Sequence, residues 1–230
     1  MTNQPFPVDS RGAEVASGRA ALYDFFVRMF DWLPDRDLLL DIRRGHFQEV
    51  FVSCCELGDV GFRDGLKLIA SYRSKIADRE DEEVLAELAV DRTRILRGTG
   101  HAGMLPPYEA IYRRNRESGN SILEVKRFYR KAGILPDETV LESLDYLCVE
   151  LDFMKQLCLR EQELRLKGEG FEEVVLLEEE FLRLHLGGWV GEFCRAIAKH
   201  ALTNFYRAIG HALDAFIRTE RQWLGQKRAS

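Results

Sequence analysis

The sequence predicts an all-α protein, a single helical domain of roughly ten helices that spans residues 1–230. Apolar residues recur at intervals of three and four over most of the chain. No segment shows the period-two alternation, bounded by turns, that is typical of a β-hairpin. Glycine and proline stand where the helical patterns stop, which is where helices are expected to end.

The first half of the chain is predicted to contain four helices. Pro34 ends the first, because proline lacks the N–H that a continuing helix needs, and Gly45 ends the second. The third and fourth are marked by apolar stripes alone. These helices are expected near residues 16–30, 35–44, 62–76 and 84–95.

The second half is predicted to contain longer helices. Ser121 to Glu124 has the form of a capping box, and Gly133 suits the position after the end of that helix. A long helix is expected from 137 to 167, ended by Gly168. The remaining helices are expected from Phe171 to Gly187-Gly188 and from Trp189 towards Trp223.

A stiff corner at residues 104–112 separates the two halves. Two prolines precede Tyr108-Glu109 and a second tyrosine, Tyr112. Pro107 suits the first position of a helix, in which Tyr108 and Tyr112 would share one face. The corner therefore predicts a recognition surface for an extended or helical partner. The irregular segment 98–107 before it is the candidate hinge within the single domain.

Composition and motifs predict a protein that is not an enzyme and holds no cofactor or metal. The net charge of −5 disfavours a nucleic-acid partner. Five irregularly spaced cysteines fit a reducing cytoplasm, and no apolar run is long enough for stable membrane insertion. No P-loop, zinc-ligand spacing or serine elbow occurs. Gly98 to Gly103 has the spacing of a dinucleotide fingerprint, but without a preceding strand it predicts a loop.

Several polar residues lie on predicted apolar stripes, and each has a structural and a functional interpretation. Asp91 would either pair with Arg94 one turn away or lie at the edge of a groove and bind a cationic ligand. Asp145 would solvate an outer face, or would form with Glu142 an acidic ridge that binds an arginine or a lysine. His185 and Trp189 would line a pocket or belong to the core.

These segments together resemble the TorD/DmsD/NarJ family of redox-enzyme maturation chaperones, nearest its TorD/DmsD branch. The resemblance covers most of the chain in order. Tyr146 stands where the family often has histidine, Leu96 where it has phenylalanine and Ala110 where it has serine. The matching segments are 19–30, 91–98, 106–112, 147–154, Phe181-x-x-x-His185-Leu186-x-x-Trp189-x-x-x-Phe193 and Phe205-Tyr206.

The resemblance implies a cytoplasmic chaperone that binds the twin-arginine signal peptide and the body of a molybdopterin-containing oxidoreductase subunit. It would assist cofactor insertion and delay export. Acids would meet the two arginines, and aromatic side chains would meet the apolar segment. The acids expected in this peptide-binding site are Asp91, Glu109, Asp145 and Glu150. The other members are Arg94, Tyr108, Tyr112, Tyr146, His185 and Trp189.

Two other functions are compatible with the sequence. Some relatives are reported to bind guanine nucleotide, so GTP is a candidate ligand, with the loop Gly98–Gly103 as its cradle. A helical adaptor without peptide binding is the other alternative. The protein would be a monomer or a domain-swapped dimer. In the chaperone interpretation, Tyr108→Ala with Glu109→Ala weakens binding and leaves the helical content unchanged.

Overall fold

The computed structural model describes residues 8–99, 103–113, 121–135 and 142–229, and every regular element in them is a helix. The all-α class is thereby confirmed, with eleven α-helices and one short 3₁₀ helix in this described part. The chain forms two compact units, which are described separately below. The prediction of one domain with a hinge at 98–107 stays a prediction.

The first unit contains residues 1–28, 108–188 and 223–230. Its helices are held by an aromatic core in which Phe153 lies 4.4 Å from Tyr129 and 4.6 Å from Phe181, measured between ring centroids. The unit takes its helices from α1 (Ser10–Asp31), α6 (Glu109–Tyr112), α7 (Ser121–Ala132), α8 (Leu147–Lys167), α9 (Glu172–Leu184) and η1 (Leu186–Gly188).

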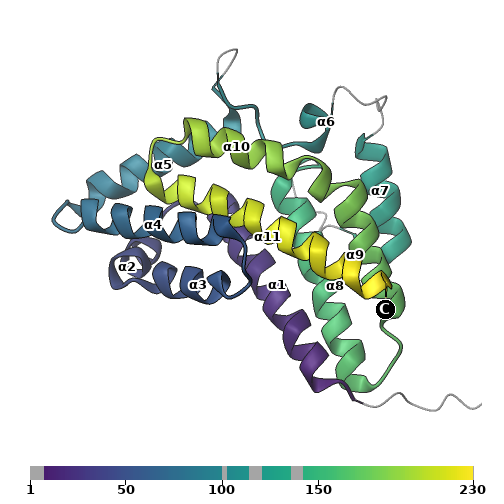
Figure 1. Cartoon of the computed structure of the whole chain (residues 1–230). Helices are drawn as coiled ribbons and strands as arrows, with labels where there is room; N and C mark the ends of the chain where they lie inside the picture. The colour runs from purple at the N-terminus through teal and green to yellow at the C-terminus, as the bar shows by residue number, and fades with distance from the viewer. Residues whose placement is uncertain (1–7, 100–102, 114–120, 136–141, 230) are drawn as a thin grey trace, which may run out of the picture. The chain divides into compact units, whose positions relative to one another are not determined.

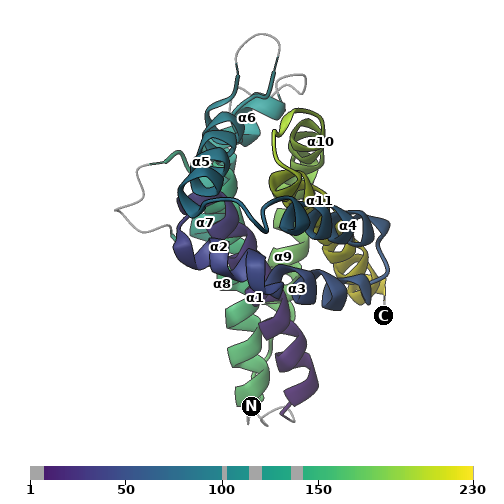
Figure 2. The ribbon, with the colours of Figure 1, turned by 90° about the vertical axis from the view of Figure 1, so that its left-hand side faces the viewer.

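The N-terminal part of α1 runs alongside α8, as Figures 1 and 2 show. Buried charges join them. The Arg19 guanidinium lies 2.8 Å from Glu161 on α8 and 2.6 Å from Glu178 on α9, and Arg165 also pairs with Glu161. All four side chains are at most 7% exposed. Because each charge has a partner, the burial of this group is tolerated, and it fixes the register of α1 on α8.

The second unit contains residues 29–107 and 189–222. In its core the Phe205 ring lies 5.2 Å from Phe47 and 6.0 Å from Tyr72. Gly61 allows a close approach, since a Cβ there would lie 2.9 Å from the His211 carbonyl oxygen. The helices that belong to it are α2 (Arg36–Arg44), α3 (His46–Cys55), α4 (Val60–Lys75), α5 (Asp81–Arg97), α10 (Val190–His200) and most of α11 (Asn204–Ala229).

Most helix ends lie where the sequence places them. Asp35 caps α2 by accepting a bond of 2.9 Å from the Leu38 amide. Gly45, Gly133 and Gly168 follow α2, α7 and α8 with positive φ values of 90°, 68° and 64°. Glycine has no Cβ to clash in this left-handed region, so these three predicted helix ends are confirmed.

Three predictions about elements are wrong, and one helix was missed. The helix α3 was not expected, and the long helix begins at Leu147 rather than at 137 (residues 136–141 lie outside the described part). The helix expected from Trp189 to Trp223 is broken at residues 201–203. The corner helix α6 starts at Glu109, because Tyr108 is extended and forms an antiparallel backbone bridge to Tyr146.

One helix start in the second unit leads to a test of stability against pH. Asp59 caps α4 through the Gly61 amide at 2.8 Å and accepts two bonds from Arg218, at 2.9 and 2.7 Å. The Arg218 bond lowers the pKa of Asp59 below its ordinary value of 3.8. A folded-state pKa that is lowered stabilises the fold above the unfolded pKa, and this contribution is lost as pH falls through the folded pKa.

We therefore expect Asp59→Asn to lower the free energy of unfolding by about 1 kcal/mol at pH 7. The difference from the unmodified protein should shrink below about pH 4, where the unfolded-state aspartate takes up its proton. Urea denaturation at pH 7 and at pH 3 measures both values. A difference of the same size at both pH values would mean that the Asp59 charge contributes nothing.

Candidate binding site

The corner of the first unit is built on the backbone between Tyr108 and Tyr146. The Glu109 amide donates to the Asp145 carbonyl oxygen at 3.0 Å, beside the bridge. The rings of Tyr108 and Tyr146 lie 5.3 Å apart with 45° between their planes. Pro107, which precedes the bridge, needs no hydrogen-bond acceptor, so the chain can turn here without an unsatisfied donor.

Asp145 serves as the cap of the corner helix. Its carboxylate accepts a bond of 3.0 Å from the Ala110 amide in the first turn of α6 and one of 2.6 Å from the Ser143 hydroxyl. A negative charge at a helix N-terminus is favourable, and the side chain is 1% exposed. Asp145 therefore holds the corner together. This structural role is neither of the two interpretations that the sequence offered.

Glu109 is a fully buried acid of the corner, with no exposed surface. It pairs with Arg113 one turn later, and His185 Nδ1 lies 3.1 Å from Glu109 Oε2. Because a carboxylate only accepts, the imidazole donates from Nδ1. Arg113 also donates to the Leu184 carbonyl oxygen at 2.8 Å, so this set ties α6 to the end of α9.

His185 is packed among aromatic rings. Its ring centroid lies 5.0 Å from that of Phe181 and 5.7 Å from that of Phe128. Tyr129 is buried nearby and donates to the Leu144 carbonyl oxygen at 3.0 Å. Burial, followed by the negative charge of Glu150, raises the pKa of Tyr129 well above its ordinary value, so this phenol is a neutral donor at pH 7.

The accessible acid of the corner is Glu142, which the sequence groups with Asp145 in a possible acidic ridge but which is not among the ten expected site residues. The Tyr108 hydroxyl donates to Glu142 Oε2 at 2.7 Å. Burial, followed by this hydrogen bond, raises the pKa of Tyr108 to about 12. Tyr108 and Tyr112 are half-buried and Glu142 is exposed, so these three side chains are the part of the corner that a ligand can reach.

The structure brings seven of the ten expected site residues into the first unit. Four of these, Glu109, Asp145, Glu150 and His185, are at most 3% exposed. Glu150 lies in the first turn of α8, where its amide donates to the Tyr146 carbonyl oxygen. Asp91, Arg94 and Trp189 lie in the second unit.

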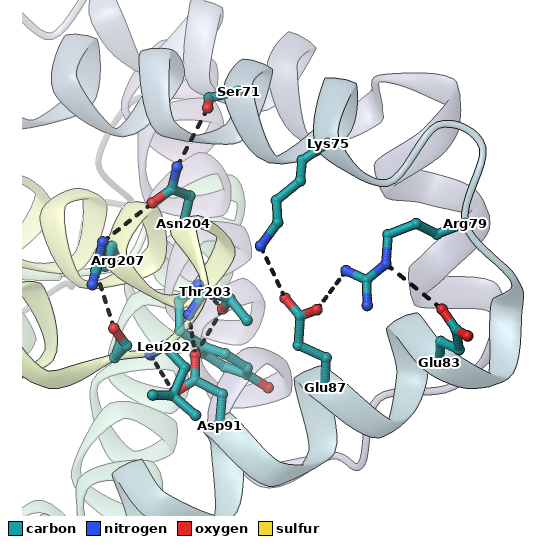
Figure 3. A network of polar contacts seen from close by, with 12 residues as sticks. Ser71, Lys75, Arg79, Glu83, Glu87, Asp91, Leu202, Thr203, Asn204 and Arg207 are labelled. Carbon is teal, nitrogen blue, oxygen red and sulfur yellow. Dashed lines mark hydrogen bonds and ion pairs between the residues drawn. The ribbon is translucent and has the colours of Figure 1, made fainter.

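Asp91 in the second unit has partners that differ from the expected one. Its carboxylate accepts from the Leu202 amide at 2.9 Å, the Thr203 amide at 2.8 Å and the Thr203 hydroxyl at 2.7 Å, as Figure 3 shows. Arg94 is exposed and does not pair with it. The predicted Asp91–Arg94 pair is wrong, because Asp91 points to the start of α11, whose amides need an acceptor.

The rest of this polar group lies on the solvent side of Asp91. One turn before it, Glu87 lies 3.8 Å from Lys75 and also pairs with Arg79 (Figure 3). Asn204 donates to Ser71 at 3.3 Å, which joins α11 to α4.

Trp189 is 2% exposed, and its ring centroid lies 6.2 Å from that of Phe193, so its interpretation as a core residue is confirmed.

The described residues can be checked for a metal site, a membrane-spanning helix and a dinucleotide fingerprint. No group of three or more histidine, cysteine or acidic side chains in this part of the chain is arranged to hold a metal ion. No described helix is long and apolar enough to cross a membrane. Helix α5, and no strand, precedes Gly98, so the arrangement of a dinucleotide fingerprint is not met; residues 100–102 of that loop lie outside the described part.

In the residues that the structure describes, the protein is all-helical, which is the class that the fold defines. The family model described as nitrate reductase delta subunit matches residues 59–195, which is more than half of the chain. The chain belongs to this family, the TorD/DmsD/NarJ redox-enzyme maturation chaperones, as the sequence predicts.

Three relatives show how far the likeness extends. The chaperone protein TorD of Vibrio parahaemolyticus is 28% identical over 90% of this chain and 94% of its own length. The selenate reductase assembly chaperone protein of Thauera selenatis is 30% identical over 52% of this chain and 61% of its own length. The chlorate reductase assembly chaperone protein of Ideonella dechloratans is 27% identical over 56% of this chain and 65% of its own length.

Proposed function

We propose that this protein is a cytoplasmic chaperone for a molybdopterin-containing oxidoreductase subunit. It binds the twin-arginine leader and the body of that subunit, and it delays export until the cofactor has been inserted. The observation that carries the proposal is membership of a family whose relatives are named as chaperones, two of them as assembly chaperones of chlorate and selenate reductase. The protein performs no catalysis in this role.

The corner of the first unit supports one assignment of the leader site. A twin-arginine leader offers two adjacent guanidinium groups beside an apolar segment. Glu142 offers an exposed carboxylate, and the half-buried Tyr108 and Tyr112 offer ring surface next to it. Glu109 and Asp145 are buried and already hydrogen-bonded, so they shape the corner and leave Glu142 to meet an arginine.

A pull-down from the native cytoplasm tests the function. The tagged full-length protein should recover a molybdopterin-containing catalytic subunit that still carries its twin-arginine leader, identified by mass spectrometry. Recovery of an exported subunit without its leader, or of unrelated proteins only, would contradict the proposal. The same experiment supplies the leader sequence for binding measurements.

Glu142→Gln is expected to weaken leader binding about tenfold, because a charge-assisted bond to arginine contributes more than a neutral one. Changing Arg-Arg to Lys-Lys in the leader removes the same bidentate contact. The two losses should therefore overlap when combined, and isothermal titration calorimetry measures each one. Glu163→Gln, at an exposed acid on α8, is the matched control and should leave affinity unchanged.

The assignment of the leader to this corner would be wrong if the losses caused by Glu142→Gln and by the Lys-Lys leader were additive. It would also be wrong if Glu142→Gln were folded and bound the leader with unchanged affinity. The pull-down result would still stand in that case, because it does not depend on where the leader binds. The position of the site and the function are therefore tested separately.

A further inference from the structure

Helix α7 presents an outer face that the proposed function does not use. Its inner residues Val125, Phe128, Tyr129 and Ala132 are buried, and Phe128 and Tyr129 contact the Phe153 and Phe181 rings. The helix thus has its apolar stripe covered by its own unit. The side chains that are exposed on α7 and just after it are Ile122, Leu123, Glu124, Lys126, Arg127, Arg130, Lys131 and Leu135.

Positive charge dominates this outer face. Lys126, Arg127 and Arg130 are exposed, and no ion pair joins any of them to another described residue. Lys131 pairs with Glu180 on α9 at 2.5 Å. Glu124 is the one acid on the helix against four basic side chains, so α7 carries a net charge of +3 in a chain whose net charge is −5.

The charge is increased from the neighbouring helix. Arg160 on α8 is exposed and donates to the Ala132 carbonyl oxygen at 3.0 Å, at the C-terminal end of α7. This bond satisfies one of the last carbonyl groups of α7, and the guanidinium offsets the negative end of the helix dipole. The negative C-terminal end of α7 is therefore partly offset by this cation.

Exposed aliphatic side chains flank the cations on both sides. Ile122 and Leu123 in the first turn are 44% and 51% exposed, and Leu135 after the last turn is 64% exposed. Residues four apart share a face of a helix, so Ile122, Lys126 and Arg130 lie in one row. The face combines a cationic centre with apolar ends.

We propose that the outer face of α7 docks on the surface of an anionic lipid bilayer. The cations meet the lipid phosphates, and the aliphatic side chains at the two ends enter the boundary of the acyl chains. The buried stripe of α7 stays in the protein core, so the contact is peripheral and reversible. A nucleic acid would use aromatic side chains for stacking, and the exposed face of α7 has none.

Vesicle flotation with the full-length protein tests the proposal. Vesicles of equal parts phosphatidylglycerol and phosphatidylcholine should bind the protein at low salt and release most of it at high salt, since counter-ions screen the contact. Pure phosphatidylcholine vesicles should bind little. Equal binding to both kinds of vesicle would overturn the proposal.

The decisive variant is Lys126→Gln with Arg127→Gln and Arg130→Gln. Each cation near an anionic surface raises the partition coefficient roughly fivefold, so the loss of three cations should lower this coefficient about a hundredfold. The matched control is Arg36→Gln with Arg63→Gln and Lys67→Gln, which makes the same change of net charge at exposed positions of the other unit. A loss of the same size in the control would overturn the proposal, because net charge alone would explain the binding.

Ile122→Ser with Leu123→Ser separates a bilayer from an acidic protein segment. The partition coefficient of this variant on vesicles should be about tenfold lower, because less apolar surface is buried in the bilayer. The salt dependence should be unchanged, because the cations are still present. Poly-glutamate serves as the acidic-peptide probe. Binding of poly-glutamate as tight as that of the vesicles, with no effect of the serine variant on either, would assign the face to an acidic protein and overturn the lipid proposal. Circular dichroism checks that each variant is folded.

Discussion

Replacing Glu109 by alanine is expected to lower the free energy of unfolding by about 3–5 kcal/mol. The carboxylate has no exposed surface and pairs with Arg113 and His185. Its removal takes one acceptor from a guanidinium that is 16% exposed and keeps its bond to the Leu184 carbonyl oxygen. It also takes the Glu109 acceptor from an imidazole that is 4% exposed. A buried donor that loses its partner costs its full desolvation energy, and this cost exceeds what the ion pair itself contributes.

Urea denaturation followed by circular dichroism at pH 7 measures this loss. Glu142→Ala is the control at the same corner, because it removes an exposed acid and should change stability by less than about 0.5 kcal/mol. The loss for Glu109→Gln should lie between those for Glu142→Ala and Glu109→Ala, since the amide keeps one acceptor oxygen. A loss below about 1 kcal/mol for Glu109→Ala would mean that water reaches the carboxylate.

This expectation changes how binding variants at the corner are designed. The sequence alone suggested that Tyr108→Ala with Glu109→Ala would weaken binding and leave the helices intact. The Glu109 part of that variant breaks a buried ion pair, so a loss of binding would not separate recognition from folding. Tyr108→Ala with Glu142→Gln changes two of the three reachable side chains of the corner and spares the buried pair.

The helix ends that could be predicted are those encoded by neighbouring residues. Asp35, Gly45 and Gly168 each act within one turn of the helix that they begin or end, so the local sequence is sufficient. Helix α3 was missed because Gly45 serves two helices. It ends α2 and directly precedes α3, which begins without a side-chain cap.

The breaks that could not be predicted are fixed by distant residues. Thr203 caps the start of α11 through the Tyr206 amide, but residues 201–203 hold no glycine or proline that would end α10. The Leu202 and Thr203 amides freed there donate to Asp91, 111 and 112 residues away in the chain. The start of α8 is similar, because Asp145 is engaged by Ala110 and so is kept out of the helix. Spacing rules describe one helix at a time and cannot include such partners.

The candidate site shows the same limit. The sequence identified acids that lie together at the corner of the first unit, but it could not show that burial withholds Glu109 and Asp145 from a ligand. One part was within reach of local rules. Glu109 and Arg113 are four residues apart on one helix face, which predicts their pairing.

Replacing Asp91 by alanine is expected to cost about 3–4 kcal/mol in the second unit. The carboxylate has no exposed surface and accepts two backbone amides and the Thr203 hydroxyl, which itself accepts from the Tyr206 amide at 3.2 Å. Asp91 therefore completes the N-terminal cap of α11 from another helix, and its charge suits the positive end of the helix dipole.

Thr203→Ala is the matched control, because it removes the hydroxyl and keeps both amide bonds to Asp91, and it should cost about 1 kcal/mol. Asp91→Asn keeps one acceptor oxygen and loses the charge, so its loss in the free energy of unfolding should lie between those of Thr203→Ala and Asp91→Ala. Urea denaturation gives the three values, and amide hydrogen exchange should show Leu202 and Thr203 exchanging faster than the middle of α11 in Asp91→Ala. If Asp91→Ala instead keeps its stability and loses affinity for the leader, Asp91 is a recognition residue after all. An arginine of the ligand would then have to displace two buried amides, which the burial of this carboxylate argues against.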